Sequence, residues 1–153
     1  MTTSSTALIT SDLVDLDLPS ADRRTAVRAL AERLVAAGRV TDLEQFLADI
    51  EAREAQMPTG LDGGIGIPHC RSAAVTVPTL GFGRSATGVD FGAEDGPADL
   101  VFLIAAPAGG GDDHMTVLAA LARRLVRSSF KDTLRSATDA AEAADFIAKE
   151  VSA

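Results

Sequence analysis

The sequence has no tryptophan, no tyrosine, one cysteine and fewer basic than acidic residues. Without tryptophan and tyrosine, only six phenylalanines could stack on nucleic-acid bases or sugar rings. A single cysteine excludes an internal disulfide and any zinc site built from several cysteines. The 14 basic residues against 22 acidic ones give a formal net charge of −8. We expect no nucleic-acid partner, because such binding depends on clustered lysine and arginine that neutralise phosphates.

Long apolar runs are lacking as well. The longest, residues 100–108, is about half of the ~20 residues that a membrane-spanning helix needs, and Pro107 interrupts it. The first residues are rich in serine and threonine and carry no basic region ahead of an apolar core, so they do not resemble a signal peptide. These features predict a soluble, cytoplasmic protein without direct membrane insertion, in which residues 1–10 form a loose lead-in.

The first half of the chain has the spacing of two amphipathic helices. Ser20 is the expected cap of the first, whose buried stripe would be Val27, Leu30 and Leu34, and Gly38 would end it in a left-handed conformation. Residues 41–44 (TDLE) have the spacing of a capping box, which predicts a second helix that ends near residue 54.

From residue 60 onward the sequence becomes rich in glycine and in short β-type runs. The segment 99–106 has apolar side chains on both faces of the strand that it would form, as expected for a central strand covered on two sides. The predicted strands cover residues 65–68, 77–84, 89–91 and 99–106, and the predicted helices cover 113–127, a short piece after 129 and a final stretch after 138. A chain of 153 residues with 46% hydrophobic residues fits one α/β domain, residues 1–153, with a small mixed β-sheet and helices on both faces.

Residues 63–70 (GGIGIPHC) are the most informative segment. Pro68 fixes its own φ and restricts Ile67 to extended geometry, so the chain enters His69 in a preset direction. The glycines would allow other backbone, or a partner protein, to come close. Two interpretations stay open from these residues alone: a histidine placed for chemistry, or a structural histidine beside a turn. Cys70 should face away from the histidine and serve as a packing residue.

The other histidine follows three glycines, in residues 109–114 (GGGDDH). If Asp112 or Asp113 caps the helix that follows, His114 lies in its first turn, where the helix dipole favours a neutral imidazole and a bound anion. The alternative is a histidine that faces solvent beside a flexible loop. A pair of neutral histidines suits phosphoryl transfer, with one as nucleophile and the other as electrostatic support.

Motifs for other chemistry do not occur. The sequence has neither the G-x-x-x-x-G-K-[ST] phosphate loop nor the G-x-S-x-G motif of serine hydrolases. Residues 81–86 (GFGRSA) imitate a dinucleotide fingerprint, but a strand is predicted where the helix should begin. Adjacent residues such as those at 112–114 rarely converge on one metal ion. We therefore expect no metal, nucleotide or other cofactor.

Four blocks of the sequence, taken together, resemble a known family. They are R-E-x-x-x-x-T-G over residues 53–60, GGIGIPH ending at His69, the strand DLVFLIAAP, and HMTVLAALARRL from His114. In this order they are similar to the fructose/mannitol-type enzyme IIA domains of the bacterial phosphoenolpyruvate:sugar phosphotransferase system, which share their fold with a nitrogen-regulatory branch. The resemblance covers residues 41–151.

The resemblance implies a function for three residues. His69 would accept a phosphoryl group on Nε2 from the phosphocarrier HPr and pass it to a cysteine of enzyme IIB, which phosphorylates sugar as enzyme IIC imports it. His114 occupies the place of the family's second active-centre histidine, and Arg53 that of an arginine sixteen residues before the phosphorylated one. Some members carry an acidic residue six positions before that histidine, where this chain has Gly63, so we do not transfer that role. The segment GIPHCRSAAV resembles fructose-specific members more closely than the nitrogen-regulatory branch.

Two other interpretations remain at this stage. One keeps the fold but makes the domain a regulatory module whose phosphorylation state gates a protein partner, without sugar transport. The other, outside the family, is a small-ligand-binding domain that uses a glycine-rich cleft.

Overall fold

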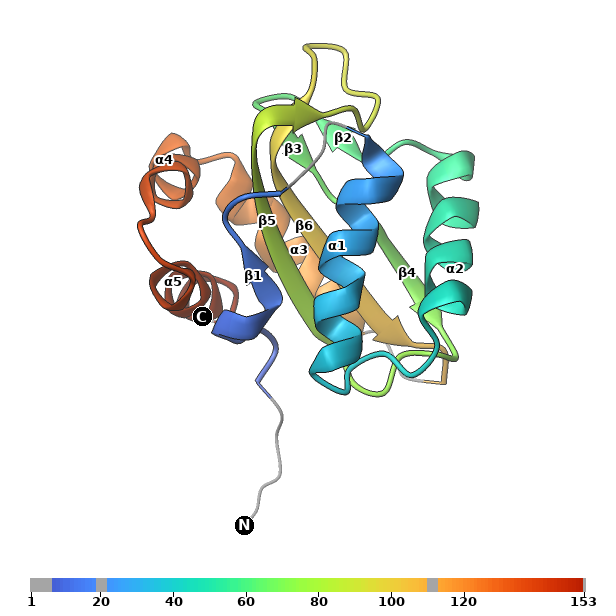
Figure 1. The fold of residues 1–153 in the computed structure, drawn as a ribbon. Coiled ribbons are helices and arrows are strands. Elements are labelled where there is room, and N and C mark those ends of the chain that lie inside the picture. Colours follow the sequence, from blue (N-terminus) through green and yellow to red (C-terminus); the bar gives the residue numbers. More distant parts are fainter. Residues whose placement is uncertain (1–6, 19–21, 110–112, 153) are drawn as a thin grey trace.

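The computed structural model describes residues 7–18, 22–109 and 113–152, with the side chains of 113–115 and 152 left out. After a short first strand, its elements follow the predicted order of two helices, a run of strands and three further helices (Figure 1). The elements are a short 3-10 turn η1 (Ser11–Leu13), β1 (Val14–Asp15), α1 (Arg23–Ala36), α2 (Leu43–Gln56), β2 (Gly60–Leu61), β3 (Ile65–Gly66), β4 (His69–Ser72), β5 (Thr79–Val89), β6 (Ala98–Pro107), α3 (Asp113–Leu125), α4 (Ser128–Ser136) and α5 (Ala140–Ser152).

The strands form one mixed sheet in the order β1-β5-β6-β3-β2, and β4 also pairs with β6. The long strands β5 and β6 are antiparallel, whereas β3 and β4 both run parallel to β6. Ile65 of β3 lies opposite Leu100, and His69 of β4 lies opposite Ile104, four residues further along both strands. The two short segments therefore keep one register, as a single strand that is interrupted at residues 67–68.

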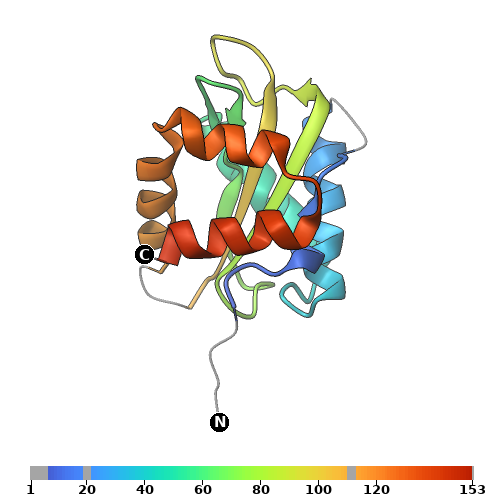
Figure 2. The same cartoon turned by 90° about the vertical axis from the view of Figure 1, so that its left-hand side faces the viewer.

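Helices cover both faces of the sheet, as predicted. Helices α1 and α2 lie on one face, and α3, α4 and α5 lie on the other (Figures 1 and 2). Strand β6 is buried at every position from Leu100 to Ala106, which confirms it as the central strand. None of the helices in the described residues combines the length and the apolar character that crossing a bilayer requires.

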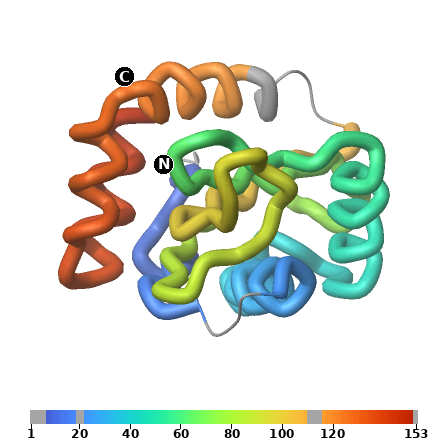
Figure 3. Tube along the Cα trace, turned by 90° about the horizontal axis from the view of Figure 1, so that it is seen from above, coloured from blue at the N-terminus to red at the C-terminus, as the bar shows by residue number. Residues whose placement is uncertain are grey.

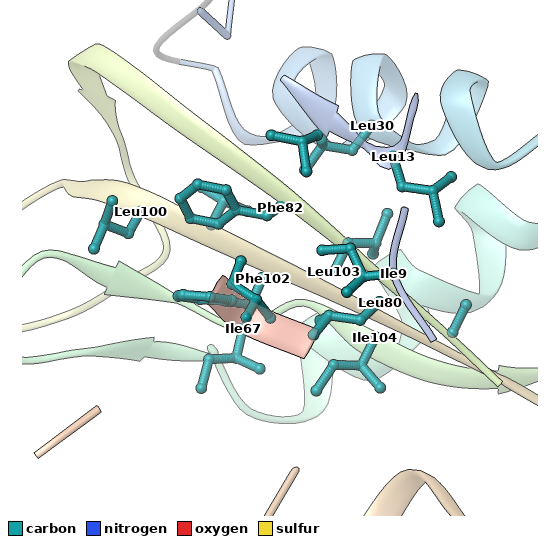
Figure 4. Packing of buried hydrophobic residues seen from close by; sticks show 14 of the residues in the cluster. Ile9, Leu13, Leu30, Ile67, Leu80, Phe82, Leu100, Phe102, Leu103 and Ile104 are labelled. Carbon is teal, nitrogen blue, oxygen red and sulfur yellow. The ribbon is translucent and has the colours of Figure 1, made fainter. Parts of the chain in front are cut away.

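A row of phenylalanines connects the sheet with the helices of the second face. The rings of Phe82 and Phe102 lie 5.1 Å apart between centroids, Phe102 and Phe130 lie 6.4 Å apart, and Phe130 and Phe146 lie 5.3 Å apart. Figure 4 shows Phe82 and Phe102 among the aliphatic side chains of the core. All six phenylalanines are buried or half-buried, so none is presented as a stacking surface for a base or a sugar.

The residues that cap the first two helices lie one or two positions after the predicted ones. The cap of α1 is Asp22, which accepts from the backbone N–H of Arg24 at 3.3 Å, whereas Ser20 lies outside the described residues. Asp42, not Thr41, caps α2 by accepting from the N–H of Gln45 at 3.1 Å, so the predicted capping box is wrong by one residue.

Thr41 instead donates its hydroxyl to the carbonyl of Ala74 and ties the start of α2 to the loop after β4. Helix α2 also continues to Gln56, two residues beyond the predicted end. Gly38 has a φ of +77° and ends α1 as expected.

The strands differ from the prediction in number and in length. Residues 79–89 form one strand where two were predicted, because Gly88 at φ +83° changes the register between Arg84 and Val89 without ending the pairing with β6. The sequence did not indicate the short strands β1, β2 and β4, which have two to four residues each. Such short strands carry too few residues to show an alternating pattern.

Candidate functional site

His69 is the first residue of β4 and follows the interruption of its strand. The N–H of Ile67 turns away from β6 and donates to the carbonyl of Thr59 at 3.2 Å, while the carbonyl of Pro68 accepts from the N–H of Ile104 at 3.0 Å. Pro68 has no N–H to add to the ladder. The segment predicted to present the histidine is thus held on both sides, and the histidine side chain is half-buried.

The imidazole ring of His69 is oriented by one hydrogen bond. Its Nδ1 lies 2.8 Å from the carbonyl oxygen of Ile67. A carbonyl can only accept, so Nδ1 carries the proton of the neutral ring and Nε2 keeps its lone pair. Within the described part of the chain, no group forms a hydrogen bond with Nε2. The ring therefore presents a nucleophilic nitrogen of defined orientation.

The glycines before the histidine are required by contacts within the protein. A Cβ at Gly66 would overlap the ring of Phe91, and a Cβ at Gly60 would lie 2.7 Å from the backbone of Phe91 and Ala93. Gly60 also donates its N–H to the carbonyl of Phe91 at 2.9 Å. Figure 3 shows the loop after β5, in yellow, lying across the green hairpin of β2 and β3. Gly60 and Gly66 therefore allow the loop after β5 to come close. Of the two possibilities stated above, other backbone or a partner protein, these contacts correspond to the first.

An arginine on α4 fixes the turn of this hairpin. Arg135 binds the carboxylate of Asp99 through Nε at 2.8 Å and Nη2 at 2.9 Å, and Nη2 also donates to the carbonyl of Gly63 at 2.5 Å. The carbonyl of Gly64 accepts from the N–H groups of Asp99 and Leu100, both at 3.0 Å. The turn is therefore anchored to the beginning of β6 by side chain and backbone together.

Arg84 of β5 performs a related task at the end of α4. Its Nη1 lies 3.0 Å from the carbonyl of Leu134, 3.1 Å from that of Arg135 and 2.9 Å from that of Ala137. A guanidinium at a helix C-terminus satisfies free carbonyls and complements the helix dipole. Sequence reasoning missed both arginines, because each contacts residues far away in the chain. The partners of Arg135 lie 36 and 72 positions away, and those of Arg84 lie 50 to 53 positions away.

Arg53 lies in the last turn of α2, the helix that packs against β4. Four residues earlier on the same helix face, Asp49 accepts from the hydroxyl of Ser72 at 2.6 Å and fixes that packing. Arg53 is half-buried, and its guanidinium forms no hydrogen bond or ion pair with any residue that the structure describes. It is thus a cation without an internal partner among those residues, on the helix next to the histidine's strand.

His114 is the second residue of α3, so the predicted helix start is confirmed. Its side chain and Asp112 lie outside the described residues. The loop before α3 is tied to β4, because the N–H of Ala108 donates to the carbonyl of Ser72 at 3.1 Å. Helix α3 therefore begins a few residues from the end of the strand that carries His69. The first turn of a helix is where an anion is favoured.

Cys70 is a packing residue, as its place in an extended strand predicted. Only 6% of it is exposed, and it faces the side of the sheet opposite to that of its neighbour His69. Burial, with a smaller contribution from the charge of Asp49, raises the pKa of its thiol to about 12. The thiol is therefore protonated at neutral pH and is a poor nucleophile.

We expect the Cys70 thiol to resist alkylation in the folded protein. Its pKa of about 12 leaves so little thiolate at pH 8 that iodoacetamide should react about three orders of magnitude more slowly than with the urea-unfolded chain. Because the raised pKa belongs to the folded state, the corresponding stability is present below the pKa of the unfolded thiol and is lost as pH rises toward 12. Mass spectrometry of timed samples measures both rates, and equal rates would contradict the assignment.

Hollows on the surface of the described residues include the following two. One of about 250 Å³ lies between α1 and α2, and one of about 460 Å³ lies beside Arg84 and Arg135. His69 and the glycines of residues 60–66 line neither of them. Among the described residues, no three His, Cys, Asp or Glu side chains stand close enough together to hold a metal ion.

Comparison with known proteins identifies the family. The family model described as "Phosphoenolpyruvate-dependent sugar phosphotransferase system, EIIA 2" matches residues 7–150. The chain belongs to this family. The EIIA 2 resemblance inferred from the four sequence blocks is therefore confirmed, whereas the roles of His69, His114 and Arg53 stay predictions.

Three relatives of this EIIA domain show the range of the family. The chain is 40% identical over 141 residues to the PTS system fructose-specific EIIA component of Haloferax volcanii, covering 92% of both proteins. The nitrogen regulatory protein IIA-Ntr of Neisseria meningitidis superposes with a TM-score of 0.83 at 26% identity, covering 92% of this chain and 96% of that one. Enzyme IIA-mannitol of Escherichia coli, solved in complex with phosphorylated enzyme IIB-mannitol, gives a TM-score of 0.75 at 27% identity, with coverage of 90% and 95%.

Proposed function

We propose that this EIIA domain is a cytoplasmic phosphocarrier of a fructose-type sugar phosphotransferase system. It receives a phosphoryl group from HPr on Nε2 of His69 and passes it to a cysteine of enzyme IIB. The observation that carries the proposal is the 2.8 Å hydrogen bond from Nδ1 to the carbonyl of Ile67, which leaves Nε2 as the free nucleophile. The 40% identity to a fructose-specific EIIA component supports the choice of system.

The chemistry requires only the transfer of one phosphoryl group between nucleophiles. Nε2 of His69 attacks the phosphorus in line, a new N–P bond forms, and the N–P bond to the donor histidine breaks with its electron pair returning to that imidazole. The proton stays on Nδ1, which keeps donating its hydrogen bond to the carbonyl of Ile67, and this contact stabilises the positive charge that develops on the ring. The cysteine thiolate of enzyme IIB then attacks the same phosphorus: an S–P bond forms, and the N–P bond to His69 breaks with its electron pair returning to Nε2, which restores the neutral histidine. Neither step requires a nucleotide or a metal.

Arg53 and His114 would stabilise the transferred group. The guanidinium of Arg53 has no internal ion-pair partner among the described residues, so it is available to offset negative charge. His114, in the first turn of α3, would donate from a neutral ring to a phosphoryl oxygen. The net charge of −8 favours encounter with a basic partner surface.

The proposal is tested by incubating the protein with phosphoenolpyruvate, enzyme I and HPr and then measuring its intact mass. We expect the addition of one phosphoryl group, labile in acid and stable in alkali, as for a phosphohistidine. An established EIIA domain in the same mixture serves as the positive control. A phosphorylated control beside an unmodified protein would contradict the proposal.

A regulatory module is the second candidate, and the similarity to IIA-Ntr favours it. Such a module would accept the phosphoryl group from HPr but would have no enzyme IIB to discharge it. Adding the enzyme IIB encoded nearby or fused to this domain distinguishes the two, because only the transport component should lose its phosphoryl group to that partner. A DNA-binding region in the same polypeptide would instead support regulation. The third interpretation, a small-ligand site in the glycine-rich segment, gains no support from the two hollows described above, because residues 60–66 line neither of them.

We expect His114→Ala to slow transfer to enzyme IIB by about 10- to 1,000-fold, the range for loss of one preorganised donor. His69 should still be phosphorylated in this variant. Rapid-quench measurement of phosphoryl loss gives the rate, and thermal unfolding shows whether the fold is kept. Unchanged kinetics would assign His114 to the helix surface alone.

A further inference from the structure

Glu54 is a buried carboxylate that the proposed transfer does not use. Only 4% of it is exposed, and it lies one residue after Arg53 on α2. No lysine or arginine among the described residues forms an ion pair with it. A buried charge of this kind is costly unless hydrogen bonds stabilise it. The buried carboxylate of Glu54 therefore depends on its hydrogen-bond partners.

Both oxygens of the Glu54 carboxylate bind the same residue. Oε2 accepts from the backbone N–H of Thr59 at 2.8 Å, and Oε1 accepts from the hydroxyl of Thr59 at 2.9 Å. Thr59 is itself only 9% exposed. This bidentate contact ties the end of α2 to the start of the hairpin, through the glutamate and the threonine of the R-E-x-x-x-x-T-G block.

The contact continues to the imidazole ring through one further residue. The carbonyl of Thr59 accepts from the N–H of Ile67 at 3.2 Å, and the carbonyl of Ile67 accepts from Nδ1 of His69 at 2.8 Å. Thr59 directly precedes β2 and Ile67 directly follows β3, so this bond extends the antiparallel pairing of the two strands, in which Gly60 lies opposite Gly66. The orientation of the Ile67 peptide groups therefore depends on where Glu54 holds Thr59.

We propose that Glu54 is a positioning residue for His69, acting through Thr59 and the carbonyl of Ile67 to keep the proton on Nδ1 and Nε2 free. The effect of Glu54 on phosphoryl transfer rests on the proposed function. The effect of Glu54 on the ring does not, since the tautomer of His69 is a property of the unphosphorylated protein.

The test compares Glu54→Ala with Glu54→Gln in the full chain. Alanine removes the contact with Thr59. Glutamine can retain it, because its amide oxygen accepts from the N–H of Thr59 while its amide nitrogen donates to the hydroxyl, which then acts as acceptor. The matched control is Glu51→Ala, on the same helix, which removes the ion pairs with Arg23 at 2.9 Å and Arg24 at 3.2 Å and does not touch residues 59–69.

Two readouts separate positioning from general stability. Nitrogen-15 NMR of the histidine ring reports the tautomer, and phosphorylation by phospho-HPr gives the maximal rate and the KM. In Glu54→Ala we expect a smaller share of the Nδ1–H tautomer and a maximal rate lower by about 10- to 100-fold, with KM little changed. Glu54→Gln and Glu51→Ala should resemble the wild type in both readouts.

Thr59→Val provides a second test if Glu54→Ala does not fold, because it removes only the hydroxyl contact with Glu54. We expect the same loss of the Nδ1–H tautomer and of the maximal rate, but a smaller one. An unchanged tautomer and rate in folded Glu54→Ala, or in Thr59→Val, would overturn the inference. So would an equal loss of rate in Glu51→Ala at the same loss of thermal stability. If the wild type accepts no phosphoryl group, the proposed function fails, and the NMR comparison alone decides the role of Glu54.

Discussion

His69→Ala should accept no phosphoryl group from phospho-HPr, whereas the wild type gains one. The substitution removes the only nitrogen that the proposed mechanism uses as nucleophile. The buried Cys70 thiol, whose pKa is raised to about 12, offers no replacement next to it. Intact mass after incubation with phosphoenolpyruvate, enzyme I and HPr measures the effect.

The His69 variant should remain folded, so loss of transfer can be assigned to chemistry. The imidazole is half-buried, and its hydrogen bond to the carbonyl of Ile67 is worth about 0.5 to 1.5 kcal/mol. Cys70→Ser is the matched control at the adjacent position, and we expect it to be phosphorylated and discharged at nearly the wild-type rate. Full phosphorylation of His69→Ala would contradict the assignment of the phosphorylated residue.

The larger elements could be predicted because their residues carry their own signal. The stripe of Val27, Leu30 and Leu34 predicts the buried face of α1, and all three side chains are buried. The apolar segment 99–106 likewise predicts the central strand that the structure contains as β6. In both cases the burial pattern repeats over several turns or positions, so neighbouring residues in the sequence are sufficient to reveal it.

The local details were harder to predict where two residues offer the same chemistry. Thr41 and Asp42 are both good caps, and only the contact of Thr41 with the distant carbonyl of Ala74 leaves Asp42 to cap α2. A single Gly88 in the middle of β5 resembles a strand end in the sequence, although pairing with β6 resumes at Val89. Tertiary contacts decide such cases, and one sequence does not contain them.

The candidate site shows the same division. The rigid approach to His69 could be predicted, because Pro68 acts on the backbone beside it. The hydrogen bonds that orient the ring could not, since they connect Glu54, Thr59 and Ile67 across a hairpin. The same holds for the ion pair of Arg135 and Asp99, which joins a helix to the beginning of β6. The sequence therefore predicts the backbone setting of the candidate residue His69, but not the contacts that support it.

Gly64→Ala should destabilise the protein by more than its backbone conformation alone would cost. Gly64 has a φ of +82°, which costs alanine about 1 to 2 kcal/mol. A Cβ there would also overlap the carboxylate of Asp99 and lie 2.8 Å from Nη2 of Arg135, so the ion pair that anchors the hairpin must move. Displacing packed groups costs a further 1 to 3 kcal/mol or so. We expect a total loss of about 2 to 5 kcal/mol in the free energy of unfolding, measured by urea denaturation.

Gly38→Ala is the matched control, because it isolates the cost of the backbone conformation. Gly38 has a nearly equal φ of +77°, but a Cβ built on it meets nothing within 4 Å. Its substitution should therefore cost only the backbone term of about 1 to 2 kcal/mol and leave phosphorylation of His69 unchanged. Gly64→Ala, by contrast, moves the turn that leads into the Ile67 carbonyl and should slow phosphorylation wherever it still folds. Equal losses of stability in the two variants would show that Asp99 and Arg135 yield freely and do not anchor the hairpin.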